Sequence, residues 1–493
     1  MLSRRQFLEL PVAGALVGCL GDEGPGRFSC GVASGDPTQT SVVLWTRIDG
    51  ETDEAVKWIV ATDPELQNVV AGGATDAIEE HDWCAKVVVD GLDPDTEYFY
   101  GFRLNGEQSI IGRTRTAPIQ REQLRFALVS CASFAWGYFH SYRHIAQRTD
   151  IDAVLHVGDY IYEYRTGRYG KERACEPPTE TVTLADYRER YRQYHRDPDL
   201  GAMHAAHPMI AIWDDHEIAN NAWANGAANH DPATQGDFAD RKEAALRANI
   251  EYLPVAGWDQ RTCARTLSFG SLASLRMCDT RTMRDQQLLN ADDPALKLGD
   301  RKMIGAEDEA ATLAWLANRT PRWSLLVQTT MFAQRPHDDE LSGDLWDGYP
   351  AQRDTLLAAI GDAHAAGGAV VVLGGDLHSS WANDLAVDLP AYIAAGGSVS
   401  GEGCVAVELI ASAITSEAPS GSSNDPQYAT IAARSPHVRF VELTQRGYID
   451  VSLDETDVTA TILLSPSVSR RADGQHTIAA VLVSQRDKPH WKR

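Results

Sequence analysis

The chain has 493 residues, of which 43% are hydrophobic and 23% charged, ordinary values for a globular protein that buries a core. This length allows about three domains, or one large domain and one small one, and the composition excludes a largely disordered or fibrous protein. With 69 acidic and 45 basic residues, the formal net charge is −24. Such a surface repels phosphate backbones, so nucleic-acid binding is not expected.

Residues 1–19 predict an export signal. Residues 3–8, which include Arg4 and Arg5, closely match the twin-arginine motif, and an apolar stretch too short to span a bilayer follows. Residues 16–19 resemble a lipobox that would lipidate Cys19, and cleavage as an ordinary signal peptide is the alternative. We therefore expect export by the twin-arginine translocase to the periplasm, the cell surface or the medium. Membrane contact would run only through a lipid anchor at Cys19.

Eight cysteines are widely spaced and contain no Cys-x-x-Cys pair, which argues against a zinc ribbon or a thioredoxin-like site. An exported location permits disulfides, but the sequence does not assign their pairing.

Residues 27–118 predict an all-β domain. Segments rich in β-formers at 41–48, 56–60 and 84–89 are separated by turn signals, and a Leu-x-Pro-x-Thr-x-Tyr run begins at Leu92. That run resembles the corner of a fibronectin type III domain. We expect a fibronectin- or Ig-like β-sandwich that serves as a scaffold, because it holds no cluster of catalytic side chains.

From residue 122 to 493 the pattern is that of an α/β fold, in which buried strands alternate with helical stretches such as 184–194. The strands are expected at 126–130, 153–157, 209–213 and 369–373. Each is followed directly by polar residues, namely Cys131, then Asp159, then Asp214, Asp215 and His216, then Asp376 and His378. Ligands of open α/β sheets bind beyond the carboxyl ends of the strands, so these clusters predict one metal centre. Residues 405–493 return to strands and are expected to form a second sheet layer.

The side chains in these clusters suit cations. Asp159 can bridge two cations through its two oxygens, and Tyr162 can supply a phenolate, a hard ligand for ferric iron. A helix N-cap is the alternative for Asp159. Asp214 and Asp215 would repel each other at neutral pH unless cations neutralise them, and Asn220 can add an oxygen.

At these motifs the sequence resembles the PhoD-type alkaline phosphatases of the calcineurin-like metallophosphatase superfamily. The matching segments are 131–134, 158–163, 213–217 and 375–378, in the family's order, and 31–37 with 45–47 resembles its N-terminal sandwich. The resemblance runs from residue 28 to 465. It implies a metallophosphatase catalytic domain over 122–493, built as a four-layer β-sandwich flanked by helices.

The resemblance also implies a mixed site of Fe³⁺ and Ca²⁺, with Zn²⁺ or Mn²⁺ as the alternative two-metal content. The iron ligands fall on Cys131, Asp159, Tyr162 and His378. The calcium ligands fall on Asp159, Asp215, Asn220 and Asp376, with Asn221 as the alternative to Asn220. The donor chemistry agrees, because thiolate, phenolate and imidazole suit iron whereas carboxylate and amide oxygens suit calcium.

We assign the catalytic role to His216. It is poorly placed to bind metal if Asp215 does, so it can point at the substrate and either stabilise the transition state or protonate the leaving oxygen. The alternative is a hydrogen bond that holds Asp214.

The expected function is that of an exported phosphoester hydrolase. A metal-activated hydroxide would attack in line and release inorganic phosphate from small-molecule phosphomonoesters and diesters. One alternative keeps the same metal site in a phosphodiesterase or phospholipase. The other is a non-catalytic cell-surface binding protein, against which the retained set of ligands argues.

Overall fold

The computed structural model describes residues 26–290, 292–318, 320–335, 342–419, 434–469 and 475–493. The expected export signal, with Arg4, Arg5 and Cys19, lies outside these residues. Within the ranges just given, no helix combines the length and apolarity that a membrane span requires.

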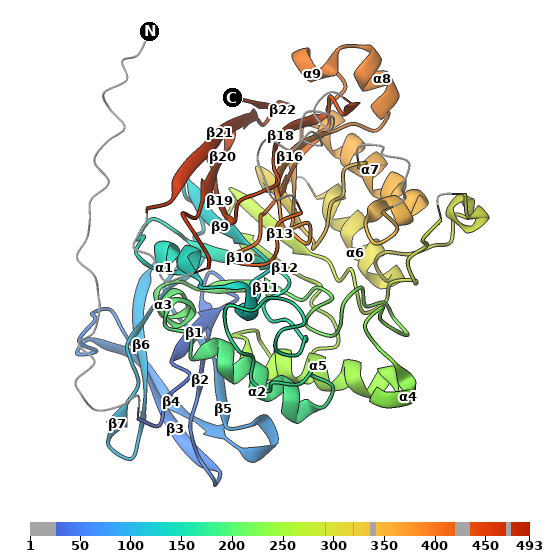
Figure 1. Cartoon of the computed structure of the whole chain (residues 1–493). Helices are drawn as coiled ribbons and strands as arrows, with labels where there is room; N and C mark the ends of the chain where they lie inside the picture. The colour runs from blue at the N-terminus through green and yellow to red at the C-terminus, as the bar shows by residue number, and fades with distance from the viewer. Residues whose placement is uncertain (1–25, 291, 319, 336–341, 420–433, 470–474) are drawn as a thin grey trace.

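The largest sheet has ten strands in the order β22-β21-β20-β19-β9-β10-β11-β1-β2-β5 (Figure 1). Its strands are β22 (Lys488–Lys492), β21 (Thr477–Gln485), β20 (Asp457–Leu464), β19 (Gly447–Leu453), β9 (Leu124–Val129), β10 (Ala153–Val157), β11 (Met209–Ile212), β1 (Val32–Gly35), β2 (Ser41–Arg47) and β5 (Cys84–Asp90). The central strands β9, β10, β11 and β1 run parallel, and the neighbouring pairs on either side are antiparallel.

A second sheet has seven strands in the order β12-β13-β14-β15-β17-β16-β18. These are β12 (Arg265–Phe269), β13 (Ala273–Met277), β14 (Trp323–Val327), β15 (Val370–Gly374), β17 (Ala406–Ile410), β16 (Ser380–Leu385) and β18 (Val438–Glu442). Here β13, β14, β15 and β17 run parallel. The strands expected at 126–130, 153–157, 209–213 and 369–373 are therefore confirmed to within two residues as β9, β10, β11 and β15, but they belong to two sheets.

The N-terminal strands divide between two sheets. A separate five-stranded sheet contains β4 (Val69–Ala77), β3 (Glu54–Ala61), β6 (Glu97–Leu104), β7 (Glu107–Gln108) and β8 (Gly112–Arg115). By contrast β1, β2 and β5 extend the ten-stranded sheet, because Gly35 of β1 pairs with Met209 of β11. A Cβ on Gly35 would lie 2.5 Å from the Met209 carbonyl oxygen, so only glycine permits this approach. The N-terminal part thus contributes to the sheet that carries the polar strand ends.

The C-terminal strands do not form a layer of their own, which corrects the expectation for 405–493. β17 and β18 lie in the seven-stranded sheet, whereas β19 to β22 lie in the ten-stranded sheet next to β9. Sheet membership depends on pairing between residues more than three hundred positions apart, such as Ile449 with Leu128, and this pairing leaves no local signal in the sequence.

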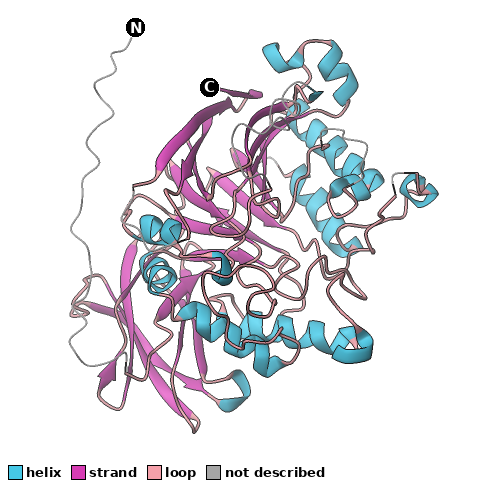
Figure 2. Ribbon diagram, viewed as in Figure 1, coloured by secondary structure: helices cyan, strands magenta, loops and turns pink. Residues whose placement is uncertain are grey.

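The two large sheets pack against each other, and helices cover them (Figure 2). Trp323, Leu325 and Val327 of β14 point into a core shared with the ten-stranded sheet, while Leu326 points into a second core. The helices are α1 (His140–Ala146), α2 (Leu184–His195), α3 (Pro198–Ala206), α4 (Pro232–Gln235), α5 (Phe238–Tyr252), α6 (Ala306–Ala317), α7 (Pro350–Ala365), α8 (Leu389–Ala394) and α9 (Gly397–Ser400). α6 and α7 contribute to the second core, and α1, α2, α3 and α5 to the first. The mixed α/β fold is confirmed, and the Ig-like and four-layer descriptions stay predictions.

All seven cysteines in the described part of the chain are buried and free. The expectation that an exported location permits disulfides is therefore not realised among these seven.

Candidate metal centre

The polar strand ends meet between the two large sheets. Cys131, Asp159 and Asp215 follow β9, β10 and β11 of the ten-stranded sheet, and Asp376 and His378 follow β15 of the other. The two edges are joined directly, because Ser130 forms a parallel β-bridge with Ala413 just beyond β17. The centre thus lies where carboxyl ends of parallel strands from both sheets converge, rather than at the edge of one sheet.

Four of the expected ligands have unusual backbone conformations. Cys131, Asp159, Asp376 and His378 have φ values of +58°, +56°, +66° and +52°. Residues other than glycine rarely adopt this left-handed region, and such strain persists only where surrounding structure imposes it. β9, β10 and β15 therefore each lead into a sharp turn that carries a donor side chain.

The first cluster is formed by Cys131, Asp159, Tyr162 and His378. One donor atom each of Cys131, Asp159 and His378 lies within 4.8 Å of the other two. The Tyr162 hydroxyl donates to Asp159 Oδ2 (2.9 Å) and lies 3.0 Å from His378 Nε2. Because His378 Nδ1 lies 2.8 Å from the Glu417 carbonyl oxygen, it carries the proton, and Nε2 presents its lone pair.

Burial in this cluster disfavours the anionic forms unless a cation is present. It raises the pKa of the Cys131 thiol and of the Tyr162 phenol well above their ordinary values, and the Asp159 carboxylate adds to both shifts. Thiolate and phenolate are soft and hard anionic donors that a trivalent or divalent cation would hold deprotonated. The donor set therefore fits a transition metal.

The second cluster consists of Asp214, Asp215 and Asp376, with one carboxylate oxygen of each within 4.8 Å of the other two. Asp214 Oδ2 and Asp215 Oδ1 are buried and have no hydrogen-bond partner. Buried polar atoms are rarely left unpaired, so these two oxygens fit a bound cation. Asp376 Oδ2 accepts a hydrogen bond from Thr330 Oγ1 (2.8 Å), which fixes its orientation.

Asp159 connects the clusters, because it also groups with Asp215 and His216 within 4.8 Å. This position matches the bridging role expected of it, whereas the expected N-cap alternative lacks a helix, since no helix begins at Asp159. Asn220 is held beside the centre through its backbone, whose N–H donates to Glu163 Oε1 (2.9 Å). The backbone N–H of its neighbour Asn221 donates to Asp215 Oδ2 (2.5 Å). The choice between Asn220 and Asn221 as a ligand stays a prediction.

His216 is held by Glu163 and not by Asp214. Its Nδ1 lies 2.7 Å from Glu163 Oε2, while Asp214 Oδ1 accepts a hydrogen bond from Arg281. Burial opposes the charge on His216, but the carboxylates of Glu163, Asp215 and Asp159 outweigh it and raise its pKa well above 6.5. These carboxylates therefore favour the protonated imidazole. Because Glu163 holds Nδ1, Nε2 is the ring nitrogen that can meet a substrate.

Two further acidic residues within the same motifs, Glu217 and Glu163, hold parts of the site in place through hydrogen bonds. The Glu217 carboxylate accepts hydrogen bonds from the backbone N–H groups of Asp159 (3.0 Å), Tyr160 (2.5 Å) and Asp214 (2.8 Å). It ties the turn after β10 to the turn after β11. Glu163, in addition to holding His216, accepts from Asn229 Nδ2 (2.9 Å). The sequence motifs contain both residues, but only their contacts reveal these roles.

Arg281 is the main residue that the sequence analysis missed. It follows β13 and is fully buried among the carboxylates of the second cluster, with its Nη2 3.6 Å from both Asp215 Oδ1 and Asp376 Oδ1. Its Nη1 donates to Asp344 Oδ2 (3.1 Å). Its position in the sequence could have indicated a site residue, because Arg281, like the expected ligands, lies just beyond the end of a parallel strand.

Aromatic side chains border the first cluster. The Tyr162 ring stacks on His216 with centroids 4.1 Å apart and on Tyr169 at 5.5 Å, and the Tyr164 ring lies 5.3 Å from His216. Tyr164 and Tyr169 are partly exposed, whereas Tyr162 is buried. Tyr164 and Tyr169 thus form a partly exposed border of the first cluster.

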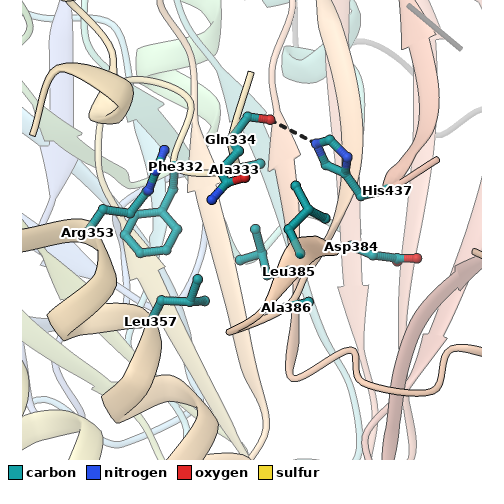
Figure 3. Close-up of a pocket in the computed structure, with 10 residues that line it drawn as sticks. Phe332, Ala333, Gln334, Arg353, Leu357, Asp384, Leu385, Ala386 and His437 are labelled. Carbon is teal, nitrogen blue, oxygen red and sulfur yellow. Dashed lines mark hydrogen bonds between the residues drawn. The ribbon is translucent and has the colours of Figure 1, made fainter. Parts of the chain in front are cut away.

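A cavity elsewhere in the fold has a different character. Figure 3 shows it beside α7, with Phe332, Leu357 and Leu385 among its lining and His437 Nε2 2.8 Å from the Gln334 carbonyl oxygen. None of the expected metal ligands is among the residues that line it. It is thus separate from the strand-end centre.

Gly158→Ala is expected to destabilise the fold. Gly158 has a φ of +99°, and a Cβ there would overlap the Asp214 Cβ. Left-handed strain costs about 1–2 kcal/mol and overpacking about 1–3 kcal/mol, so we expect the free energy of unfolding in urea to fall by about 2–5 kcal/mol. Gly236→Ala is the matched control, because Gly236 also has a positive φ (+78°) but a Cβ there meets nothing within 4 Å. Equal losses in both variants would contradict the close packing at Asp214.

The chain is similar in sequence and structure to known proteins over the segments that form this centre. Residues 126–462 match the PhoD-like phosphatase family, and residues 20–118 match the N-terminal domain of PhoD-like phosphatases. Alkaline phosphatase D of Bacillus subtilis (strain 168) is 34% identical over 492 residues, which cover 94% of this chain and 81% of that protein. A solved structure of PhoD superposes with a TM-score of 0.86 at 31% identity, covering 96% of this chain and 93% of that one.

Proposed function

We propose, from the fact that the chain belongs to the PhoD-like phosphatase family, that it releases inorganic phosphate at the centre between its two large sheets. Membership and the match to alkaline phosphatase D make it a phosphoric ester hydrolase. The observation that supports this location is that donor atoms from the strand ends of both sheets form three adjoining groups, which are linked through Asp159 and Asp215.

We further propose that the two clusters hold different cations. Cys131, Asp159, Tyr162 and His378 would hold Fe³⁺, and Asp159, Asp215, Asn220 and Asp376 would hold Ca²⁺, with Zn²⁺ or Mn²⁺ as the alternative content. The mixed thiolate, phenolate and imidazole donors of the first cluster and the all-oxygen second cluster support this division. When bound, such cations would lower the pKa of water and offset the negative charge of the phosphoryl oxygens.

The remaining chemistry belongs to the chain's own residues. His216, held through Nδ1 by Glu163, would use Nε2 to protonate the leaving oxygen or to stabilise its negative charge. Tyr162 and Tyr164 flank the imidazole and limit its movement. The four-layer arrangement of the catalytic part belongs to the same proposal, supported by the helices that pack into both cores.

Release of p-nitrophenol from p-nitrophenyl phosphate and from bis-p-nitrophenyl phosphate, with inorganic phosphate as the second product of the monoester, tests the proposed function. We expect release from the monoester and a measurable rate on the diester. Activity on the diester alone, or on phospholipids alone, would favour the phosphodiesterase or phospholipase alternative. No release from any phosphoester by metal-loaded protein would contradict the proposal and favour the binding protein.

We also propose that the protein is exported by the twin-arginine translocase and anchored by a lipid at Cys19. The support is the motif at residues 3–8 and the lipobox-like residues 16–19. Labelling cells with a tagged fatty acid tests the anchor, and a Cys19→Ser variant that takes up as much label as the wild type would contradict it.

Tyr162→Phe is expected to remove a visible phenolate-to-iron absorption band. The Tyr162 hydroxyl lies between Asp159 and His378, so its removal takes away the phenolate donor. Tyr164→Phe is the control, because the Tyr164 ring lies beside His216 and not between those two donors. Native protein that is colourless, fully active and loaded with zinc would overturn the iron assignment.

Removal of calcium with a selective chelator is expected to abolish activity reversibly. Asp215 Oδ1 would again lack a partner, and the neighbouring carboxylates of the cluster would repel one another. Activity is measured before chelation, after it, and after calcium is restored. Full activity after exhaustive chelation would show that the carboxylate cluster works without calcium.

A further inference from the structure

Arg281 is held in place from two sides and presents one free edge to the carboxylate cluster. Its Nε donates to Asp214 Oδ1, and its Nη1 donates to Asp344 Oδ2 at 3.1 Å. Its Nη2 is buried and has no hydrogen-bond partner, although Asp215 Oδ1 and Asp376 Oδ1 each lie 3.6 Å away. The guanidinium therefore forms ion pairs with two carboxylates without a hydrogen bond to either.

This placement is unusual for a buried ion network. A guanidinium among carboxylates normally completes its hydrogen bonds, because an unsatisfied buried donor is costly. Here the side chain is fully buried, and the nearest oxygens beyond its two anchors belong to expected cation ligands. The charge of Arg281 acts on Asp215 and Asp376 at a distance that leaves their oxygens available to a cation.

We propose that Arg281 is a positioning residue that serves as a permanent internal cation for the centre. It keeps Asp214, Asp215 and Asp376 together before a metal arrives, and it limits how strongly the cluster attracts a divalent ion afterwards. Since like charges repel over these distances, the guanidinium weakens cation binding while it stabilises the empty cluster. This inference rests on the proposed cation centre.

The matched control is Arg276, on β13 itself. Its guanidinium is also buried, donates to Asp308 and contacts Thr312 Oγ1 at 3.2 Å. Arg276→Gln therefore removes a buried ion pair on β13, away from the centre, whereas Arg281→Gln removes one at the centre. Both variants are expected to lower the Tm of calcium-free protein, by roughly 5–10 °C for loss of one partner of a buried pair.

A second substitution, Asp376→Asn, distinguishes the cause of the Tm loss in Arg281→Gln from that in Arg276→Gln. Asp376→Asn keeps a group that can bond to Thr330 but removes one negative charge from the cluster. In calcium-free protein, adding Asp376→Asn to Arg281→Gln is expected to raise the Tm. Adding it to Arg276→Gln is not expected to raise the Tm. Failure of Asp376→Asn to raise the Tm of Arg281→Gln would overturn the inference, because the lost stability would then not come from repulsion in the cluster.

Calcium titration supplies the other readout, followed as the rise in Tm. Arg281→Gln is expected to half-saturate at about tenfold lower calcium or less than the wild type, since a nearby positive charge is gone. Arg276→Gln should match the wild type. An unchanged or higher half-saturating concentration in Arg281→Gln would overturn the inference. If calcium raises the Tm of no protein, the wild type included, the proposed cation centre fails, and the Asp376→Asn comparison still decides the role of Arg281.

Discussion

Replacing His378 with alanine is expected to empty the first cluster and reduce phosphate release to the background rate. His378 Nε2 is one of the donors that converge with Asp159 and Cys131, and its orientation is fixed by Glu417. Mutation of a partner outside the ligand shell typically costs about 10–100-fold in metal affinity, so loss of a ligand should exceed about 100-fold. Iron content per chain and the rate of phosphate release are the two measurements.

The matched histidine control is His437→Ala. His437 is buried, whereas His378 is partly exposed. His437 bonds to the Gln334 carbonyl oxygen in the cavity of Figure 3, and none of the expected ligands line that cavity. This variant is expected to keep its iron and most of its activity, with circular dichroism as a check on folding. Retention of both iron and activity in His378→Ala would contradict the ligand role.

The strand ends were predictable because burial and chemistry change at the same residue. Val154, Leu155 and Val157 of β10 are fully buried, and Asp159 follows two residues after the last of them. An apolar run that stops at a carboxylate marks both the end of a strand and a candidate ligand, and it does so without knowledge of the partner strands. The local sequence therefore predicts the ligands without predicting the sheet topology.

The division into two sheets could not be predicted in this way. β9 and β15 look alike in sequence, as apolar runs that end in polar residues, yet they belong to different sheets. Which sheet a strand joins depends on pairing with distant residues, such as Gly35 with Met209. Glycine at position 35 permits that contact, but a glycine in a strand can equally mark a bulge, a bend or the approach of a ligand.

Arg281 shows a second limit of sequence reasoning. Arginine is usually exposed, so a single arginine after a strand suggests a surface residue. Its burial depends on Asp214 and Asp344, which lie 67 and 63 positions away. An arginine can be assigned to a site only when its partners are known. By contrast, a cysteine, histidine or aspartate at a strand end indicates a possible metal ligand by itself.

Replacing His216 with alanine is expected to leave the metal content near that of the wild type and to lower kcat. General acid catalysis is typically worth about 10²–10⁴-fold, and we expect a loss in that range on an alkyl phosphate. The loss should be smaller on p-nitrophenyl phosphate, because nitrophenolate leaves without a proton whereas an alkoxide needs one. Equal losses on both substrates would leave His216 a stabiliser of transition-state charge. Loss of metal would make it a ligand or a structural residue.

Glu163→Gln tests the same role through pH. Glu163 contributes to the raised pKa of His216, so glutamine at this position should lower that pKa while it keeps a group able to bond to Nδ1. An acid works only while protonated, and activity therefore falls as pH rises through its pKa. In Glu163→Gln the alkaline fall in kcat should begin at lower pH than in the wild type. If the alkaline limb does not move although kcat is lower, His216 does not supply the proton, and Glu163 acts only by positioning the ring.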